Sequence, residues 1–271
     1  MNTMKPTANN TLKIATIVSQ IPQLDNPSHI HRIKSLEKII VHLGKTADII
    51  LLPAGFFHHS EKSADSLYKE VETLIQQYIN EHNLSVAVCL GIDGEHNKDQ
   101  TALAINKYGI ISVGRKFYPT DAEAKYVHLA DNYLTDENKY SRIFELDGKQ
   151  FYLGICYDCF GIRKKKLDNP NVDAILNLIH GFYPQGHGWS GEAYFAKYGL
   201  AGSSKQWNCP TFSSGVFFNR AIPHKWPTGV LWNQGDKSVQ KWKYTDNAIE
   251  SLSETEILCG TETFLARLFD I

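Results

Sequence analysis

The chain has 271 residues with a formal net charge of −1, and 42% of its residues are hydrophobic. This length suits one large α/β domain or two small ones, and the composition is ordinary for a soluble globular protein. Because the net charge is close to zero, the chain as a whole has no electrostatic attraction to nucleic acid or to an anionic membrane. No apolar run approaches the length of a membrane span. We therefore expect neither nucleic acid nor a membrane as a partner.

The first ten residues are polar and lack the apolar segment of a signal peptide. We expect residues 1–10 to form a disordered tail and residues 11–271 to form one domain. The five cysteines are an odd number, and they are scattered except for Cys156 and Cys159. This usage favours free thiols and a reducing, cytoplasmic setting.

Strand and helix patterns alternate through the first half of the chain. An apolar run predicts a strand over 12–18. Ser28 is the expected N-cap of a helix, because apolar residues follow it at helical spacing as far as Leu43. The further elements expected in this half are a buried strand over 48–52, a helix over 67–79, strands over 86–92 and 101–105, and a turn over 107–109.

The second half repeats the alternation more loosely. The sequence predicts a hairpin of strands over 142–146 and 151–155 around Asp147-Gly148, and a buried strand over 174–178. A helix over 192–205 and a strand over 211–219 follow. Trp226, Trp232 and Trp242 lie in a later segment punctuated by Pro and Gly, and we interpret them as packing or subunit contacts. The whole pattern predicts a layered α/β domain with two similar halves.

Cys156 stands where an apolar strand ends and a helix begins, in the run Gly154-Ile155-Cys156-Tyr157-Asp158. A helix start supplies unpaired backbone N–H groups and positive potential, and both favour a thiolate. Two other apolar strands also end in unusual residues, over 49–55 and 114–117. A lysine such as Lys116 near the cysteine would favour the thiolate and stabilise a developing oxyanion.

These segments resemble the nitrilase superfamily, the carbon–nitrogen hydrolases, in order and spacing over roughly residues 12–220. The run over 154–158 looks like that family's nucleophile segment, and Arg115-Lys116 looks like the segment with its catalytic lysine. The resemblance implies an α-β-β-α sandwich, often a homodimer, with a Glu-Lys-Cys triad and no metal or other cofactor. It implies a small-molecule substrate, either an amide, a nitrile or a carbamoyl compound, that is hydrolysed or passes its acyl or amidino group to an acceptor.

The resemblance also assigns roles to residues of this chain. Cys156 is the expected nucleophile, which forms a thioester or thioimidate. Lys116 and the backbone N–H of Tyr157 are expected to stabilise the tetrahedral intermediate. Glu123 is the candidate for a second glutamate near the lysine.

Ala54 departs from the family pattern, which has the triad glutamate directly after the proline of this strand end. A methyl group cannot take the cysteine proton, and a positioned general base is typically worth about 10²–10⁴ in rate. Three explanations stay open. Glu123, or behind it His58 or His59, serves as the base; the protein has lost catalysis and binds a small molecule or a protein partner; or the alanine is an engineered exchange.

Aromatic and histidine side chains follow the strand over 174–178. We expect His180, Phe182 and Trp189 to overhang the site and bind substrate, together with Tyr157 and Phe160.

Cys156 and Cys159 also form a C-x-x-C pair, which is compatible with redox chemistry. The surroundings of a thioredoxin-like pair are absent, and no second Cys or His pair has zinc-site spacing. We therefore favour the nucleophile interpretation and predict no metal site.

Overall fold

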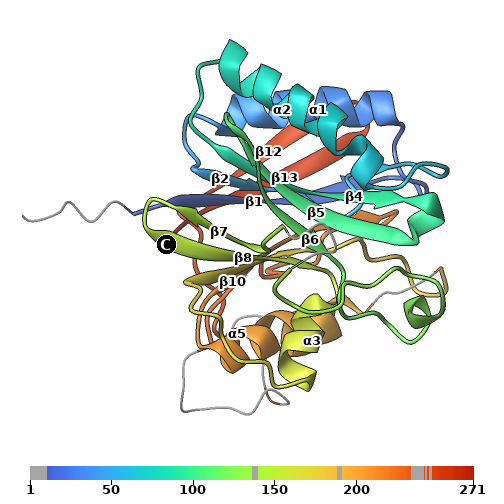
Figure 1. Ribbon diagram of the computed structural model, residues 1–271, viewed down its shortest axis with the longest axis vertical. Coiled ribbons are helices and arrows are strands. Elements are labelled where there is room, and N and C mark those ends of the chain that lie inside the picture. Colours follow the sequence, from blue (N-terminus) through green and yellow to red (C-terminus); the bar gives the residue numbers. More distant parts are fainter. Residues whose placement is uncertain (1–10, 136–139, 188–190, 233–240, 242, 244–245) are drawn as a thin grey trace, which may run out of the picture.

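The computed structural model describes residues 11–135, 140–187, 191–232, 241, 243 and 246–271. Two layers of strands lie between two layers of helices (Figure 1). The helices α1 (His29–Leu43) and α2 (Tyr68–Glu81) cover one outer face, and α3 (Asp158–Lys164) and α5 (Ala201–Trp207) cover the other. The expected α-β-β-α sandwich is confirmed. The tail predicted over residues 1–10 lies outside the described residues.

The strands are β1 (Lys13–Ile21), β2 (Ile49–Leu51), β3 (Phe57–His58), β4 (Ala87–Gly94), β5 (Asp99–Asn106), β6 (Gly109–Arg115), β7 (Ile143–Leu146), β8 (Lys149–Ile155), β9 (Ala174–Leu178), β10 (Thr211–Phe218), β11 (Gly229–Val230), β12 (Ser253–Cys259) and β13 (Glu262–Asp270). One hydrogen-bonded path joins most of them, in the order β6-β5-β4-β2-β1-β10-β9-β8-β7. The strand β1 links the two halves of this path, because β2 pairs with its first part and β10 with its last part, both in parallel. The strand β13 runs antiparallel along β1 and carries β12 on its other edge.

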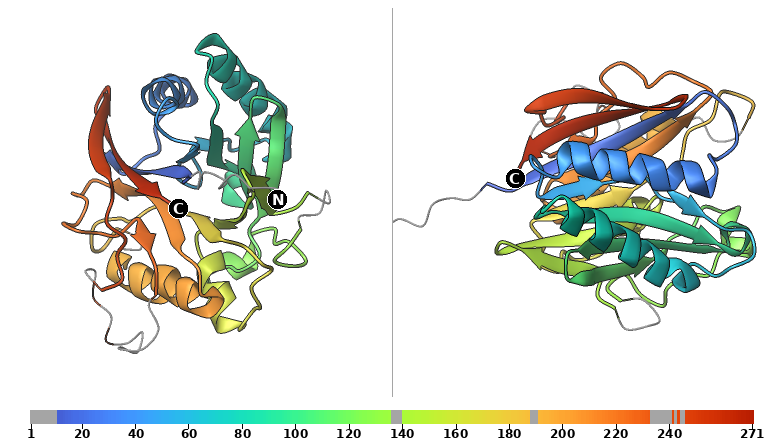
Figure 2. Two further views of the ribbon diagram at one scale, coloured as in Figure 1. Left: turned by 90° about the vertical axis from the view of Figure 1, so that its left-hand side faces the viewer. Right: turned by 90° about the horizontal axis from the view of Figure 1, so that it is seen from above.

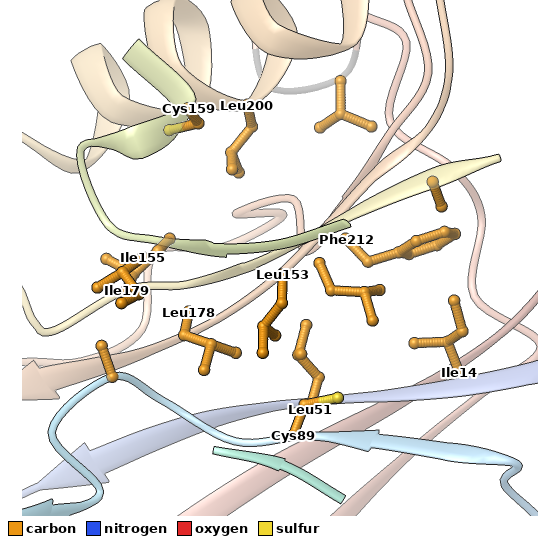
Figure 3. Close-up of a cluster of buried hydrophobic side chains, with 14 of the residues drawn as sticks. Ile14, Leu51, Cys89, Leu153, Ile155, Cys159, Leu178, Ile179, Leu200 and Phe212 are labelled. Carbon is orange, nitrogen blue, oxygen red and sulfur yellow. The ribbon is translucent and has the colours of Figure 1, made fainter. Parts of the chain in front are cut away.

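The core between the two strand layers is built by alternation along each strand. In β2, Ile49 and Leu51 face the other layer, whereas Ile50 belongs to the cluster beneath α1 and α2. Successive side chains of a strand point to opposite faces, so one continuous apolar run serves two cores. Figure 3 shows the inner core, where Ile14, Leu51 and Cys89 oppose Leu153, Leu178 and Phe212.

The first helix begins as the sequence predicts. The hydroxyl of Ser28 accepts a hydrogen bond from the backbone N–H of His31 at 3.3 Å, which is the expected N-cap interaction. The helices α1 and α2 lie side by side over their sheet (Figure 2). Arg32 of α1 forms a buried ion pair with Glu262 of β13 at 2.7 Å, which ties the helix to the last described strand. Of the helices in the described ranges, none has the length and apolarity needed to cross a membrane.

The helix predicted over 192–205 is present as three consecutive segments. They are α4 (Glu192–Tyr194), a π-helical stretch over Phe195–Leu200, and α5. A Cβ atom on Gly199 would lie 2.8 Å from the sulfur of Cys159, so the glycine allows this helix to pack closely on α3.

The segment after residue 220 completes the sheet. Trp226 and Trp232 are buried in the inner core, whereas Trp242 lies outside the described residues. The sequence predicted no strand here, yet β13 pairs with β1 along nearly its whole length. The resemblance therefore ends before an essential part of the fold.

Candidate active site

A cavity of about 750 Å³ opens at the carboxyl ends of the parallel strands. This edge is where ligands commonly bind in α/β folds, because the loops that follow the strands converge there. Six of the residues predicted from the sequence line the cavity: Ala54, Glu123, Cys156, Tyr157, Phe160 and His180.

Cys156 occupies a strained turn between β8 and α3. Its backbone φ is 48°, which a residue with a side chain rarely adopts. The turn is held by its N–H, which donates to the carbonyl of Leu178 at 2.6 Å, and by its carbonyl, which accepts from Asn177 Nδ2 at 3.2 Å. The residue is only 8% exposed. Backbone strain maintained by surrounding bonds is typical of functional positions.

Cys159 has a structural position in the same turn. Its thiol is buried and donates to the carbonyl of Cys156, with the sulfur 3.1 Å from the oxygen. Burial raises the pKa of Cys159 well above its ordinary value, so this thiol stays protonated. The second cysteine of the pair therefore supports the turn.

Lys116 lies fully buried beside the cavity and is paired with Glu123. Its Nζ donates to Glu123 Oε1 at 2.5 Å and to Gln100 Oε1 at 2.9 Å. Burial lowers the pKa of Lys116, but the charges of a Cys156 thiolate and of Glu123 outweigh burial, so its pKa is raised and the ammonium is charged. Burial raises the pKa of Glu123, but the charge and hydrogen bond of Lys116, together with the Thr120 N–H and the charge of His180, outweigh burial and bring the pKa to about 2.

Asp158 connects the lysine segment to the cysteine turn. One carboxylate oxygen accepts the N–H groups of Phe117 at 2.9 Å and Tyr118 at 3.0 Å. The other accepts from the N–H of Ile155 at 3.1 Å and from Arg142 Nη1 at 2.8 Å, and the side chains of Asp158 and Arg142 are both fully buried. Sequence reasoning assigned neither of them a role, although a charge inside an apolar run was a usable signal.

His180 lies in the cavity together with a carboxylate and the cysteine. Its Nε2 is 3.1 Å from each carboxylate oxygen of Asp93, and the imidazole lines the same cavity as Cys156. Burial lowers the pKa of His180, but Asp93 and Cys156 more than offset burial and raise it to about 10. Asp93, at the end of β4, also lines the cavity and was not predicted from the sequence.

Ala54 lies on the cavity wall next to the segment that carries His180. Its N–H donates to the carbonyl of Ile179 at 3.3 Å, and its side chain is nearly buried. A Cβ atom on Gly91 would be 2.4 Å from the Cα of Ala54, so this glycine sets the position of the strand end.

The two histidines considered as alternative bases lie in the loop that follows. His58 belongs to β3. The Nδ1 atom of His59 accepts the backbone N–H groups of Glu61 and Lys62, each at 3.1 Å, and so stabilises its own loop.

One wall of the cavity is a stack of aromatic rings. The centroids of Tyr157 and Phe160 are 4.5 Å apart, and those of Phe160 and Tyr194 are 5.6 Å apart, with nearly parallel planes. Phe182, expected at the substrate, is instead fully buried and packs against Phe217 in the core behind this wall. Trp189, the other aromatic residue expected there, lies outside the described residues.

Among the described residues, no group of three or more His, Cys, Asp or Glu side chains is arranged to hold a metal ion.

Comparisons with known proteins give structural matches. No family model matches the sequence, and no curated protein sequence is significantly similar to it. Among solved structures, an amidase from Nesterenkonia sp. superposes with a TM-score of 0.54 at 12% identity, over 76% of each chain. A cysteine-to-alanine variant of the Nesterenkonia AN1 amidase, assigned to the nitrilase superfamily, superposes with a TM-score of 0.55 at 12% identity, again over 76% of each chain.

A third matching structure shows a covalent adduct in that amidase. A glutamate-to-leucine variant carries the acetamide moiety of fluoroacetamide, added covalently at the active-site cysteine. It superposes with a TM-score of 0.55 at 12% identity, over 76% of each chain. At this identity the likeness shows the fold, which is that of nitrilase-superfamily amidases.

Proposed function

We propose that this chain is a thiol-dependent hydrolase that cleaves the C–N bond of a small amide through a covalent intermediate on Cys156. The observation that carries this proposal is the cysteine at a strained turn inside a cavity that His180 and Glu123, the partner of the buried Lys116, also line. The shared fold supports it, because covalent adducts form at the active-site cysteine of an amidase with that fold.

The chemistry follows from the charges around the sulfur. The Cys156 thiolate attacks the amide carbonyl carbon, a C–S bond forms, and the carbonyl electron pair moves onto oxygen. The buried ammonium of Lys116 and the backbone N–H of Tyr157 stabilise that oxyanion, and they act strongly because the site has a low dielectric. The C–N bond then breaks, and water hydrolyses the resulting thioester.

The shape of the cavity favours a small amide with an apolar substituent. A volume of about 750 Å³ is within the range of small-molecule sites. The stacked rings of Tyr157, Phe160 and Tyr194 present a flat apolar wall. A variant of the similar amidase has been solved in complex with butyramide, which is a ligand of this kind.

Ammonia release from acetamide, butyramide and benzamide tests the proposal. We expect turnover of at least one amide, with ammonia release abolished in Cys156→Ala and retained in the matched control Cys259→Ala on β12. Intact mass after incubation with fluoroacetamide should show one adduct, mapped to the peptide that contains Cys156. Neither ammonia nor an adduct from the folded wild-type protein would contradict the proposal.

Ala54 favours a second candidate function, a protein that keeps the pocket and binds a small molecule or a protein partner without turning it over. In that case Ala54→Glu creates or greatly raises amide hydrolysis. If the wild-type protein already hydrolyses an amide, and Cys156→Ala abolishes that activity while Ala54→Glu leaves it unchanged, another base is in use and the binding function is excluded.

A further inference from the structure

We propose that His180 and Asp93 take over the role of the glutamate that the resemblance places at position 54. His180 acts as the acid–base group of Cys156, and Asp93 is the positioning residue that orients the imidazole. This inference rests on the proposed function, since it needs Cys156 as the nucleophile.

In the proposed arrangement the three side chains act in the order thiol, imidazole, carboxylate. The Nε2 atom of His180 is 3.1 Å from both oxygens of Asp93, and His180 lines the same cavity as Cys156. In this arrangement the carboxylate holds Nε2, and Nδ1 is the nitrogen that exchanges a proton with the sulfur. A nucleophile, a base within hydrogen-bond reach and a third group that orients the base form the general arrangement of cysteine and serine hydrolases.

The other candidate bases are engaged elsewhere or, like His58 of β3, do not line the cavity. Both oxygens of Glu123 are occupied, Oε1 by Lys116 and Oε2 by the N–H of Thr120 at 2.8 Å. A carboxylate with a pKa of about 2 is a weak base near neutral pH. His59 stabilises its own loop through Nδ1. Of the three candidate histidines, His180 is the one that lines the cavity with Cys156.

The chain makes room for the pair beside position 54. Gly55 has a φ of 61°, and a Cβ atom there would lie 2.7 Å from Asp93 Oδ2 and 3.4 Å from His180 Cδ2. Only a residue without a side chain fits against both groups. The histidine side chain is 24% exposed and Asp93 is 7% exposed, so the imidazole reaches the cavity while its carboxylate stays shielded.

Each proton has a defined place in the reaction. In the resting site the thiol proton resides on His180, which gives a thiolate and an imidazolium. After the thiolate adds to the carbonyl carbon, the imidazolium gives its proton to the departing amide nitrogen as the C–N bond breaks. Neutral His180 then takes a proton from water, the hydroxide adds to the thioester, and the C–S bond breaks to return the thiolate and release the acid.

The groups that face His180 set its pH behaviour. Asp93 and the Cys156 sulfur favour the imidazolium directly, Glu123 interacts with it across the cavity, and Lys116 is the second cation near the sulfur. An isolated thiol loses about 100-fold in alkylation rate between pH 8.5 and pH 6, because its thiolate fraction falls with the proton concentration. A thiolate paired with an imidazolium escapes most of that loss.

Alkylation by iodoacetamide, followed by peptide mapping at pH 6 and pH 8.5, tests the inference. We expect Cys156 of the wild-type protein to react at pH 6 within about fivefold of its rate at pH 8.5, and faster than the more exposed Cys259. His180→Gln should lower the rate at pH 6 by at least about tenfold, and Asp93→Asn by a smaller factor. The control His82→Gln, an exposed histidine at the end of α2, should match the wild type.

The outcomes separate the inference from the proposed function. If His180→Gln reacts at the wild-type rate at pH 6 while the wild type outpaces Cys259, the thiol is activated by another group and the inference is wrong. If wild-type Cys156 reacts no faster than Cys259, the proposed function itself fails. Thermal melting of each variant verifies folding, and His180→Asn serves as a second variant with a shorter amide side chain.

Discussion

Replacing Asp158 by alanine is the most informative test of how the site is held together. The substitution leaves Arg142 as a fully buried charge without its carboxylate, and breaking such a pair costs about 3–5 kcal/mol. It also removes the acceptor of the N–H groups of Phe117, Tyr118 and Ile155. These losses overlap, so we expect the free energy of unfolding to fall by at least about 4 kcal/mol rather than by their sum.

Urea denaturation of the wild type and two variants measures this effect. Glu254→Ala is the matched control, because Glu254 also pairs with an arginine, Arg267 at 2.6 Å, but is 51% exposed. An exposed pair of this kind is worth about 0–1 kcal/mol. The rate of Cys156 alkylation is the second readout, and it should fall in Asp158→Ala because the lysine segment and the cysteine turn are no longer joined.

A small effect would refute the reasoning. If Asp158→Ala destabilises the protein no more than Glu254→Ala does, the buried carboxylate does not fix the two segments. If stability falls but Cys156 alkylation is unchanged, the carboxylate supports the fold alone and does not position the site.

Three further outcomes are expected from the same geometry. Cys156→Gly should have a free energy of unfolding about 1 kcal/mol higher than that of Cys156→Ala, because only glycine adopts a positive φ without cost. Equal urea midpoints for the two variants would argue against backbone strain at this position. Glu123 has a folded pKa of about 2, so its ionised form contributes about 3 kcal/mol that is present above pH 5 and lost as the pH falls through 2. The stability difference between wild type and Glu123→Gln should therefore shrink between pH 7 and pH 2.5, and a constant difference would contradict this. Gly91→Ala should lower the free energy of unfolding by about 1–3 kcal/mol and slow the alkylation of Cys156, because the new methyl group clashes with the backbone of Ala54. A melting temperature equal to that of the wild type would show that the backbone at Ala54 shifts without cost.

Much of the fold was predictable because its strands are buried on both faces. The strand β2 is a continuous apolar run, β9 is apolar except for the buried Asn177, and Ser28 marks the start of helix α1. The strand β12 was missed for the opposite reason. Five of its seven residues are polar or lie on an exposed face, so it has neither a continuous nor an alternating apolar pattern, and its place depends on pairing with β13.

The sequence predicted the groups whose chemistry is local, and it also placed His180 at the site, but it did not predict the pairing of His180 with Asp93. Cys156 stands in a recognisable strand-to-helix turn, and Lys116 and Glu123 are seven positions apart. The pair of Asp93 and His180 spans 87 positions, and nothing in the spacing of one residue points to the other. Their meeting depends on β4 and β9 ending at the same edge of the molecule, which the sequence predicts only once the order of strands is known.

The pairing of β1 with β13 bears on how the protein is made in the cell. These two strands lie about 250 residues apart, yet they form one of the longest ladders in the sheet. During synthesis β1 leaves the ribosome long before β13 exists, so its edge stays open while the rest of the chain emerges. An unpaired strand edge is a template for pairing with another chain, and this edge is covered only after β13 has been made.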